Sequence, residues 1–528
     1  MPAKENSATI LQNRVLVEAE LDPVSQKQYV VLEPPGLSNN QADIDRLLES
    51  LSNRYPGLTV PLPLMNQIGD ILRRSGWRVT ATVSMFEENW RLVDVEEGDT
   101  TGKQYGLAVD LGTTTVVGYL VDLCSGKILG TAADYNGQIG CGEDILTRIH
   151  AAGDTGGGKQ LQQAVVKTLN GIIARLAAGE QIEARKISAV TVGANTTMVH
   201  LLLGLDPSRI CRAPYIPLVN QISGVRAAEI GLAVNPEAPL YCLPGVGSYV
   251  GGDIIGGILV SGMHRKPEVA LFVDIGTNGE MVLGNSDWLA ACAGAAGPAL
   301  EGGVARHGMR AEPGAVYRVR IDPANGGVDY KTVNGQKAVG ICGSGLVDCL
   351  AELFLAGIID QAGKFWDGRE EFVVVPASES ATGGDIAFTQ TDINNIMRTK
   401  GAVNAALEFL MESVGCGMDD LDAFYAAGAF GQFLDLESAI TIGLYPDLPR
   451  EKMVRLGNSS GEGARLALIS KQCRREAREI LRSITYLELV ASDVFMNKFA
   501  GSKFLPHTNL DYYPTVKQKL VSRGLAAK

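Results

Sequence analysis

YGLAVDLGTTTVVGYLVDL, residues 105–123, contains an apolar run that ends at an aspartate, a turn of glycine and three threonines, and a second apolar run. Two apolar runs joined by a short turn with glycine predict a β-hairpin whose strands are buried. The tip of this hairpin carries an acid, Asp110, followed by hydroxyls and the amides of a glycine turn. A polar tip on a buried hairpin indicates a chemical role.

The hairpin pattern occurs twice, because VDLGTTTVVGYL at 109–120 returns as VDIGTNGEMVLG at 273–284. Two similar hairpins predict a duplicated fold in which each half contributes one loop. From residue 105 onwards apolar strands alternate with helical segments, which is typical of a layered α/β protein. One predicted helix, residues 158–179, has an apolar face formed by Leu161, Val165, Leu169, Ile172, Ile173 and Leu176.

The first 104 residues differ from the rest of the chain in their pattern of predicted helices and strands. Two short amphipathic segments, ADIDRLLESLSNRY and LPLMNQIGDILRRSG, predict helices, and WRVTATVSMF and NWRLVDV predict strands. We therefore expect a small α+β domain within residues 1–104, with a linker at 96–104, followed by two lobes at about 105–270 and 271–528.

The two hairpin tips predict a Mg-nucleotide site. Glycine allows unusual backbone angles that point consecutive amides at one spot, and it lets a phosphate approach without meeting a Cβ. Asp110 and Asp274 are expected to hold Mg²⁺, directly or through water, because magnesium prefers few carboxylates and several waters. The predicted phosphate-binding residues are Gly112, Thr113, Thr114 and Thr115 in the first loop and Gly276, Thr277, Asn278 and Gly279 in the second. The alternative is that each Asp-x-Gly turn serves only the backbone of its hairpin, and two copies in register count against it.

A third segment, AFYAAGAFGQFLD at 423–435, consists of a strand end of small residues that leads into a predicted helix. Gly428 and Gly431 would let adenine and ribose lie against the backbone near a helix N-terminus. Close packing between elements is the alternative role for these glycines.

Charge and cysteine usage exclude several classes of function. The formal net charge of -12 argues against nucleic acid or an anionic membrane as the main partner. The N-terminus has no apolar core of a signal peptide, so a cytoplasmic protein is expected. The cysteines include no pair at Cys-x-x-Cys spacing, so no iron-sulfur cluster is expected in this chain.

The order of these motifs resembles the superfamily of acetate and sugar kinases, heat-shock ATPases and actin. That resemblance implies a duplicated actin-like ATPase fold, with two lobes that close on ATP. In this superfamily the helix before the second phosphate loop often carries an acid that orients the attacking water. SYVGGDIIGGIL at 248–259 has that position, which implies that Asp253 is the water-orienting base. A helix-capping role for Asp253 is the alternative.

Several longer phrases are similar to the ATPase domain of the reductive activators of corrinoid proteins, in the same order over roughly residues 105–510. These phrases are TVGANTTMVHLLLGLDP (191–207), LPGVGSYVGGDI (243–254), CAGAAGPALEGG (292–303), GICGSGLVD (340–348) and FAGSKFLPH (499–507). In that family a ferredoxin-like [2Fe-2S] domain, a linker and a middle domain precede the ATPase domain, and residues 1–104 resemble only the linker and the middle domain.

The resemblance implies that ATP binding and hydrolysis drive the one-electron reduction of Co(II) to Co(I) in a corrinoid protein or corrinoid methyltransferase. The electron would come from an iron-sulfur domain or a separate ferredoxin outside this chain. The sequence is also compatible with a homodimer. Two other functions fit the same fold: a small-molecule kinase, which would phosphorylate a metabolite, and a nucleotide-gated scaffold, which would form filaments.

Overall fold

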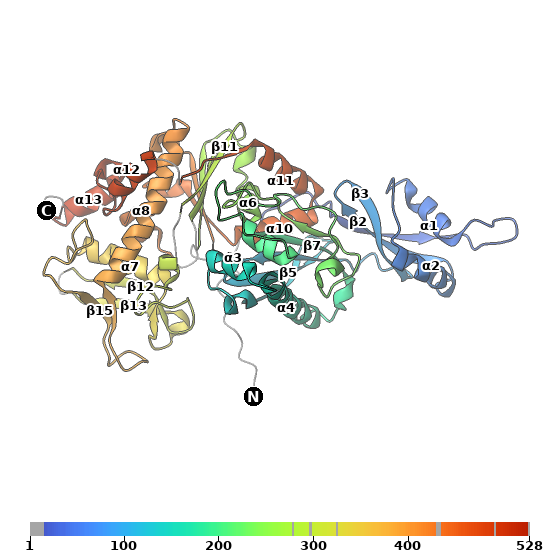
Figure 1. Ribbon diagram of the computed structural model, residues 1–528, viewed down its shortest axis with the longest axis horizontal. Coiled ribbons are helices and arrows are strands. Elements are labelled where there is room, and N and C mark those ends of the chain that lie inside the picture. The colour runs from blue at the N-terminus through green and yellow to red at the C-terminus, as the bar shows by residue number, and fades with distance from the viewer. Residues whose placement is uncertain are drawn as a thin grey trace. The chain divides into compact units, whose positions relative to one another are not determined.

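The computed structural model describes residues 15–276, 279–294, 298–323, 326–428, 434–489 and 493–525 (Figure 1). The chain divides into two compact units. The first unit comprises Leu16–Val260 and Ser459–Arg482, and the second comprises Ser261–Asn458 and Ser483–Lys528. The chain therefore leaves the first unit, returns to it for one short segment, and ends in the second.

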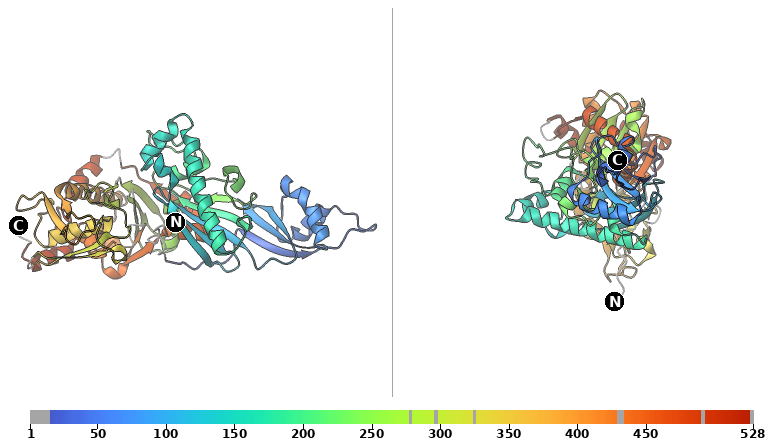
Figure 2. Two further views of the ribbon diagram at one scale, coloured as in Figure 1. Left: turned by 90° about the horizontal axis from the view of Figure 1, so that it is seen from below. Right: turned by 90° about the vertical axis from the view of Figure 1, so that its right-hand side faces the viewer.

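The first unit begins with the expected small α+β domain. Strands β1 (Ser25–Val31), β2 (Arg78–Phe86) and β3 (Asn89–Glu97) form an antiparallel sheet with β2 in the middle. Helices α1 (Asp43–Ser52) and α2 (Leu62–Arg74) lie on one side of this sheet, in blue in Figure 2. Their apolar residues recur at helical spacing and are buried against the strands: Leu47, Leu51, Leu64, Ile68 and Leu72.

The main sheet of the first unit contains the hairpin of residues 105–123. Its strands are β4 (Tyr105–Leu111), β5 (Thr115–Asp122), β6 (Ile128–Tyr135), β7 (Ile187–Ala194) and β8 (Leu240–Cys242). In space they follow the order β6-β5-β4-β7-β8. β4, β5 and β6 are antiparallel neighbours, whereas β7 runs parallel to β4 and β8 runs parallel to β7.

Helices α4 (Gly157–Gly179) and α10 (Ser459–Ile469) cover opposite faces of this sheet. A side chain at Gly118 would meet α4, and a side chain at Gly106 would meet α10. Gly118 lies opposite Val109 in the β4–β5 register, and residues 106 and 109 point to opposite faces because side chains alternate along a strand. The six apolar residues expected on one face of α4 are all buried. The other helices of this unit are α3 (Ile145–Gly153), α5 (Thr196–Leu203), α6 (Gly252–Ser261) and α11 (Lys471–Ser483).

The main sheet of the second unit repeats the arrangement of the first. Its strands are β9 (Ala270–Ile275), β10 (Gly279–Gly284), β11 (Leu289–Gly294), β17 (Ala423–Ala427), β18 (Met453–Gly457) and β19 (Ile484–Tyr486). The order β11-β10-β9-β17-β18 has three antiparallel neighbours followed by two parallel strands, as in the first unit, and β19 is added beside β11. This shared topology confirms the duplicated α/β fold that the repeated hairpins predict.

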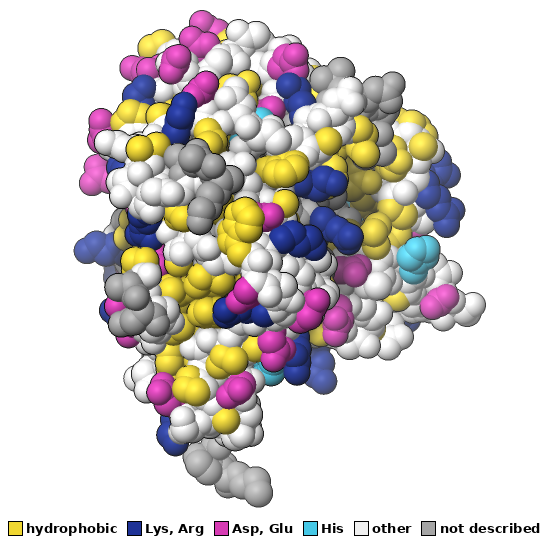
Figure 3. All heavy atoms as spheres, turned by 90° about the vertical axis from the view of Figure 1, so that its left-hand side faces the viewer, with side chains coloured by type: hydrophobic (Ala, Val, Ile, Leu, Met, Phe, Trp, Pro, Cys, Tyr) yellow, Lys and Arg dark blue, Asp and Glu magenta, His cyan; other side chains and the backbone are white. Residues whose placement is uncertain are grey.

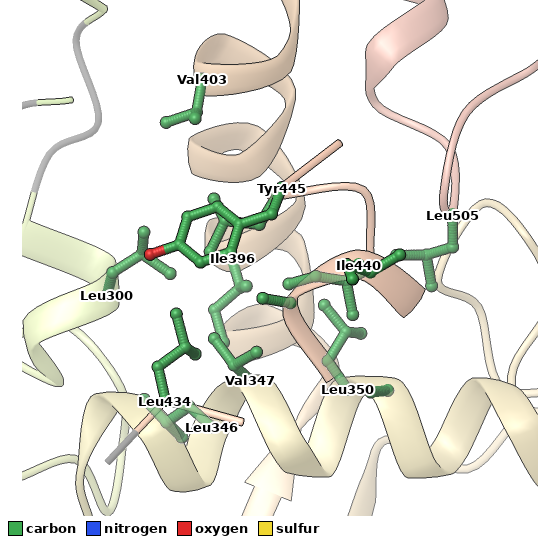
Figure 4. Packing of buried hydrophobic residues seen from close by; sticks show 14 of the residues in the cluster. Leu300, Leu346, Val347, Leu350, Ile396, Val403, Leu434, Ile440, Tyr445 and Leu505 are labelled. Carbon is green, nitrogen blue, oxygen red and sulfur yellow. The ribbon is translucent and has the colours of Figure 1, made fainter. Parts of the chain in front are cut away.

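The remaining elements of the second unit enclose an apolar core. The helices are α7 (Gly343–Leu355), α8 (Gln390–Ser413), α9 (Leu436–Thr441), α12 (Asp493–Ser502) and α13 (Pro514–Ser522), and the small sheets contain β12 (Ala315–Ile321), β13 (Val328–Thr332), β14 (Gly340–Ile341), β15 (Glu371–Val375) and β16 (Ile386–Thr389). Figure 4 shows Leu346, Val347 and Leu350 of α7 on the side of Ile396 of α8, and the ring of Tyr445 pointing toward Leu300. Gly343 is the first residue of α7, so the GICGSGLVD phrase contains the start of a helix.

The surface agrees with the modest acidic charge of the chain. Acidic and basic side chains are interspersed on the face drawn in Figure 3. In the described ranges no helix is both long enough and apolar enough to cross a membrane.

Candidate functional site

The first predicted loop joins β4 to β5, and Asp110 is the second-to-last residue of β4. The amide of Gly112 donates to the carbonyl of Thr115 at 3.0 Å, and a Cβ on Gly112 would lie 2.6 Å from that oxygen. Neither Gly112 nor Gly276 adopts a positive φ, so the expectation of unusual backbone angles at these glycines is wrong. Glycine is needed at residue 112 because two backbone segments approach closely.

Two asparagines that sequence reasoning missed hold this loop. Asn136 donates from its backbone amide to the Thr114 carbonyl at 2.8 Å and from Nδ2 to the Gly112 carbonyl at 3.0 Å. Asn195 donates from Nδ2 to the buried hydroxyl of Thr113 at 3.3 Å. The Thr113 hydroxyl therefore accepts from Asn195 and keeps its own proton for donation to a ligand.

Asp253 lies in the first turn of α6, close to the first loop. Gly251 and Gly252 bring this turn against other backbone: a Cβ on Gly251 would lie 2.5 Å from the Asn195 Cα, and one on Gly252 would lie 2.3 Å from the Leu243 carbonyl oxygen. Side chains at these positions would push α6 away from the ends of β7 and β8. The Gly-Gly-Asp order therefore sets the position of the acid.

The Asp253 carboxyl is half-buried and has an unusual pKa. Its pKa is raised to about 7, mainly by burial. The hydrogen bond from the Ile254 amide lowers the pKa, and the neighbouring charge of Asp110 raises it. Asp253 is the second residue of α6, and its Oδ1 accepts from the Ile254 amide at 2.9 Å. An N-cap residue precedes the helix and accepts from an amide two or three residues on, so this geometry does not match the capping alternative.

The second predicted loop joins β9 to β10, and Asp274 is the second-to-last residue of β9. Thr277 and Asn278 lie outside the described residues. Gly279 is the first residue of β10 and is buried. Glu280, which sequence reasoning missed, is buried and lies directly opposite Asp274, so the two side chains share one face of the sheet.

The third predicted segment begins with β17, and Gly428 directly after that strand contacts the acid of the second loop. Gly428 has φ +91°, and a Cβ there would lie 2.4 Å from Asp274 Oδ1. Its backbone therefore packs directly on the Asp274 carboxylate, and glycine is required both by the angle and by the contact. Gly431 lies outside the described residues.

The carboxylates fit a magnesium ion that is bound mainly by water and phosphate. Asp110 and Asp274 each stand at the end of a strand beside a glycine turn, so each loop offers one principal acid. Within the described part of the chain no group of three histidine, cysteine or acidic side chains could hold a metal ion. Magnesium typically binds one or two carboxylates together with substrate phosphates, so the single acid at each loop is a ligand of the type that magnesium takes.

His200 is a histidine packed inside the first unit. It is fully buried, its Nδ1 lies 2.7 Å from the Thr196 carbonyl oxygen, and its Nε2 accepts from the Leu218 amide at 3.2 Å. With Nδ1 donating and Nε2 accepting, the ring is neutral and both nitrogens are occupied. Burial accordingly lowers the pKa of His200.

Three family models match consecutive parts of the chain. They are the RACo linker region at residues 16–102, the RACo middle region at 105–266, and the C-terminal domain of RACo, the ASKHA domain, at 268–517. In these models the name middle region belongs to residues 105–266, whereas the expectation above used that name for part of residues 1–104.

Individual relatives agree with these models. The chain is 33% identical over 416 residues to the corrinoid activation enzyme RamQ of Eubacterium limosum, which covers 75% of this chain and 69% of RamQ. It is 26% identical over 428 residues to a [Co(II) methylated amine-specific corrinoid protein] reductase of Methanosarcina barkeri, covering 74% of this chain and 75% of that protein. A solved structure of a reductive activator for a corrinoid, iron-sulfur protein is 42% identical and matches with a TM-score of 0.87, over 94% of this chain and 82% of that one. The chain therefore belongs to the RACo family of reductive activators of corrinoid proteins, with an ASKHA domain of the actin-like fold.

Proposed function

We propose that this protein binds and hydrolyses Mg-ATP to drive the one-electron reduction of Co(II) to Co(I) in a corrinoid protein or corrinoid methyltransferase. The observation that carries the ATPase part is the pair of equivalent hairpins, each ending in an acid and a glycine turn at the same place in two sheets of the same topology. Family membership supports the corrinoid part.

The site residues take separate roles in this proposal. The two loops bind the phosphates, with Asp110 and Asp274 holding Mg²⁺, and the backbone at Gly428 contacts the nucleoside. Magnesium would neutralise charge on the phosphate oxygens as the terminal phosphoryl group leaves. The oxygen of a water forms a bond to the terminal phosphorus, the bridging bond to ADP breaks, and the water proton passes to the Asp253 carboxylate.

Hydrolysis is useful here because the electron transfer is uphill from ordinary donors. A gap of about 100 mV costs roughly 2.3 kcal/mol for each electron. A nucleotide can offset this cost only if it binds one conformation of the protein more tightly than another, since equal binding shifts no equilibrium. We propose that the electron itself comes from an iron-sulfur domain or a ferredoxin-like protein, and that ATP hydrolysis resets the complex.

The test is anaerobic ATP hydrolysis by the purified protein with and without a corrinoid protein in its Co(II) state, together with the absorbance change that reports Co(I). A reduced ferredoxin-like protein supplies the electron. Stimulation of hydrolysis by the corrinoid protein, and nucleotide-dependent appearance of Co(I), are expected. Equal hydrolysis with and without every corrinoid protein tried, or phosphate transfer to a metabolite instead, would contradict the proposal.

A further inference from the structure

Arg148 of α3 is a buried arginine that the proposed reaction does not use. It is fully buried, and no carboxylate in the described ranges forms an ion pair with it. Its Nε donates to the Gly142 carbonyl at 2.8 Å, whereas Nη2 has no hydrogen-bond partner among the described residues. Burial lowers the pKa of Arg148 to about 10. The charge of Asp144 opposes this lowering without forming an ion pair, and a buried cation that no carboxylate pairs with directly is costly, so its presence calls for a role.

One chain of contacts leads from Arg148 to the backbone of the first loop. Arg148 Nη1 donates to Gln138 Oε1 at 3.3 Å, and the same oxygen lies 3.4 Å from Asn136 Nδ2. Gln138 and Asn136 are fully buried. Asn136 in turn donates to the carbonyls of Gly112 and Thr114 at 3.0 and 2.8 Å. Arg148 therefore orients Gln138, and Gln138 orients the asparagine that holds the loop.

Holding these two carbonyls decides where the loop amides point. In a trans peptide the C=O and the following N–H point in opposite directions. Because the Gly112 and Thr114 carbonyls face Asn136, the amides of Thr113 and Thr115 face away from it. These are two of the donors that the first loop would offer to a phosphate.

A second chain of contacts leads from Arg148 to the Thr113 hydroxyl. Arg148 Nη1 also lies 3.4 Å from Met198 Sδ, near the start of α5. The N-cap of that helix is Asn195, whose Oδ1 accepts from the Met198 amide at 2.9 Å and whose Nδ2 donates to Thr113 Oγ1 at 3.3 Å. The Arg148 guanidinium therefore contacts both Gln138, which holds Asn136, and Met198, which lies on the helix capped by Asn195.

We propose that Arg148 is a positioning residue for the first nucleotide loop, which it aligns for phosphate through Gln138 and Asn136 and through Met198 and Asn195. This inference rests on the proposed function, because alignment of the loop matters only if the loop binds a nucleotide. Arg148 itself is buried behind these side chains and does not touch the phosphate.

The test compares Arg148→Met with Arg175→Met, a control on the surface of α4 whose side chain is 49% exposed and pairs with Asp134. Mg-ATP affinity is measured by calorimetry, and amide hydrogen exchange is measured on the protein without nucleotide. Arg148→Met should weaken Mg-ATP binding about tenfold, the effect of losing support for one charged hydrogen bond, while the control is unchanged. Exchange should accelerate at residues 112–115 and 136 while the α4 core keeps its protection.

Two further variants, Arg148→Lys and Asn136→Asp, test the inference. Arg148→Lys keeps the charge but not the fork of donors, so its affinity should lie between those of the wild type and Arg148→Met. If Arg148→Met does not fold, Asn136→Asp, which removes the donor to the Gly112 carbonyl at similar size, should show the same loss of affinity. Unchanged affinity and exchange in both variants, or faster exchange spread evenly over the first unit, would overturn the inference. Wild-type protein that does not bind Mg-ATP would overturn the proposed function instead, and the exchange data would still decide whether Arg148 holds the loop.

Discussion

Replacing Asp253 with asparagine is the sharpest test of the proposed hydrolysis step, because this carboxyl titrates close to neutral pH. Its pKa is raised to about 7, first by burial and then by the charge of Asp110. A carboxyl with this pKa is ionised to about one tenth at pH 6 and about nine tenths at pH 8. If the ionised form accepts the water proton, kcat/KM for ATP hydrolysis should rise about ninefold across that range.

The Asp253→Asn variant should lose both the rate and its pH dependence. Loss of a general base costs about 100-fold or more, and asparagine has no proton to exchange in this range. The assay is steady-state ATP hydrolysis at saturating magnesium, with Mg-ATP affinity measured at each pH so that binding and chemistry are separated. Asp154→Asn is the control, because Asp154 is an exposed acid of the same unit. A flat wild-type profile, or an Asp253→Asn variant with the wild-type profile, would refute the assignment.

The same pKa shift predicts how the stability of the first unit depends on pH. The Asp253 carboxyl binds its proton more tightly in the folded than in the unfolded protein, so stability falls as pH rises from about 4 to about 7. The full shift from 3.8 to about 7 corresponds to roughly 4 kcal/mol at 1.36 kcal/mol per unit, and partial exposure reduces it to roughly 2 kcal/mol. Asp253→Asn should therefore exceed the wild type in stability at high pH and match it near pH 4. Hydrogen exchange in α6 measures this difference, and a pH-independent difference would contradict it.

Two further substitutions test local features of the fold. Gly428→Ala combines a strained positive φ with a methyl group 2.4 Å from Asp274 Oδ1. It should therefore destabilise the second unit by about 1–3 kcal/mol and weaken Mg-ATP binding. Gly383→Ala is the control: Gly383 has a positive φ in open space, so this variant should show only the strain in thermal unfolding and leave Mg-ATP binding unchanged. Burial lowers the pKa of His200 below its ordinary value, so the contact in which its Nε2 accepts from Leu218 persists below that value and is lost only as pH falls through the lowered folded-state pKa. Exchange of the Leu218 amide, corrected for its intrinsic rate, should accelerate in acid in the wild type and not in His200→Gln, and equal behaviour of the two proteins would argue against this role for the histidine.

The repeated hairpins could be predicted from the sequence because their pattern is local. Continuous apolar runs, a glycine turn and an acid at the strand end all lie within VDLGTTTVVGYL, and the second copy shows the same order. The structure confirms both hairpins and adds that their sheets share one topology. The return of residues 459–482 to the first unit was not predicted, since an amphipathic helix does not reveal which sheet it will cover.

The supports of the site could not be predicted, because they depend on contacts between distant segments. Asn136 and Arg148 lie in NGQIGCGEDILTRI, which reads as a polar turn followed by a short helix. Nothing in that pattern says that the asparagine will hold the carbonyls of Gly112 and Thr114. The only signal was an arginine among the apolar residues of a helix, where an exposed position is the usual expectation.

The glycines show the same division between local and distant causes. Sequence reasoning explained the loop glycines by backbone angles and by the approach of a phosphate, but Gly112 is needed because of the Thr115 carbonyl. Gly251, for which no prediction was made, is needed because of the Asn195 backbone. At Gly428 the backbone angle and a close contact both require glycine, since its φ is positive and its neighbour is the Asp274 carboxylate of the second loop. A glycine whose neighbour is a predicted site carboxylate cannot be told from a glycine in a turn until the fold brings the two together. Substitutions that separate angle from contact, as Gly383 and Gly428 do, are therefore the direct way to measure how much of a site depends on its fold rather than on its motif.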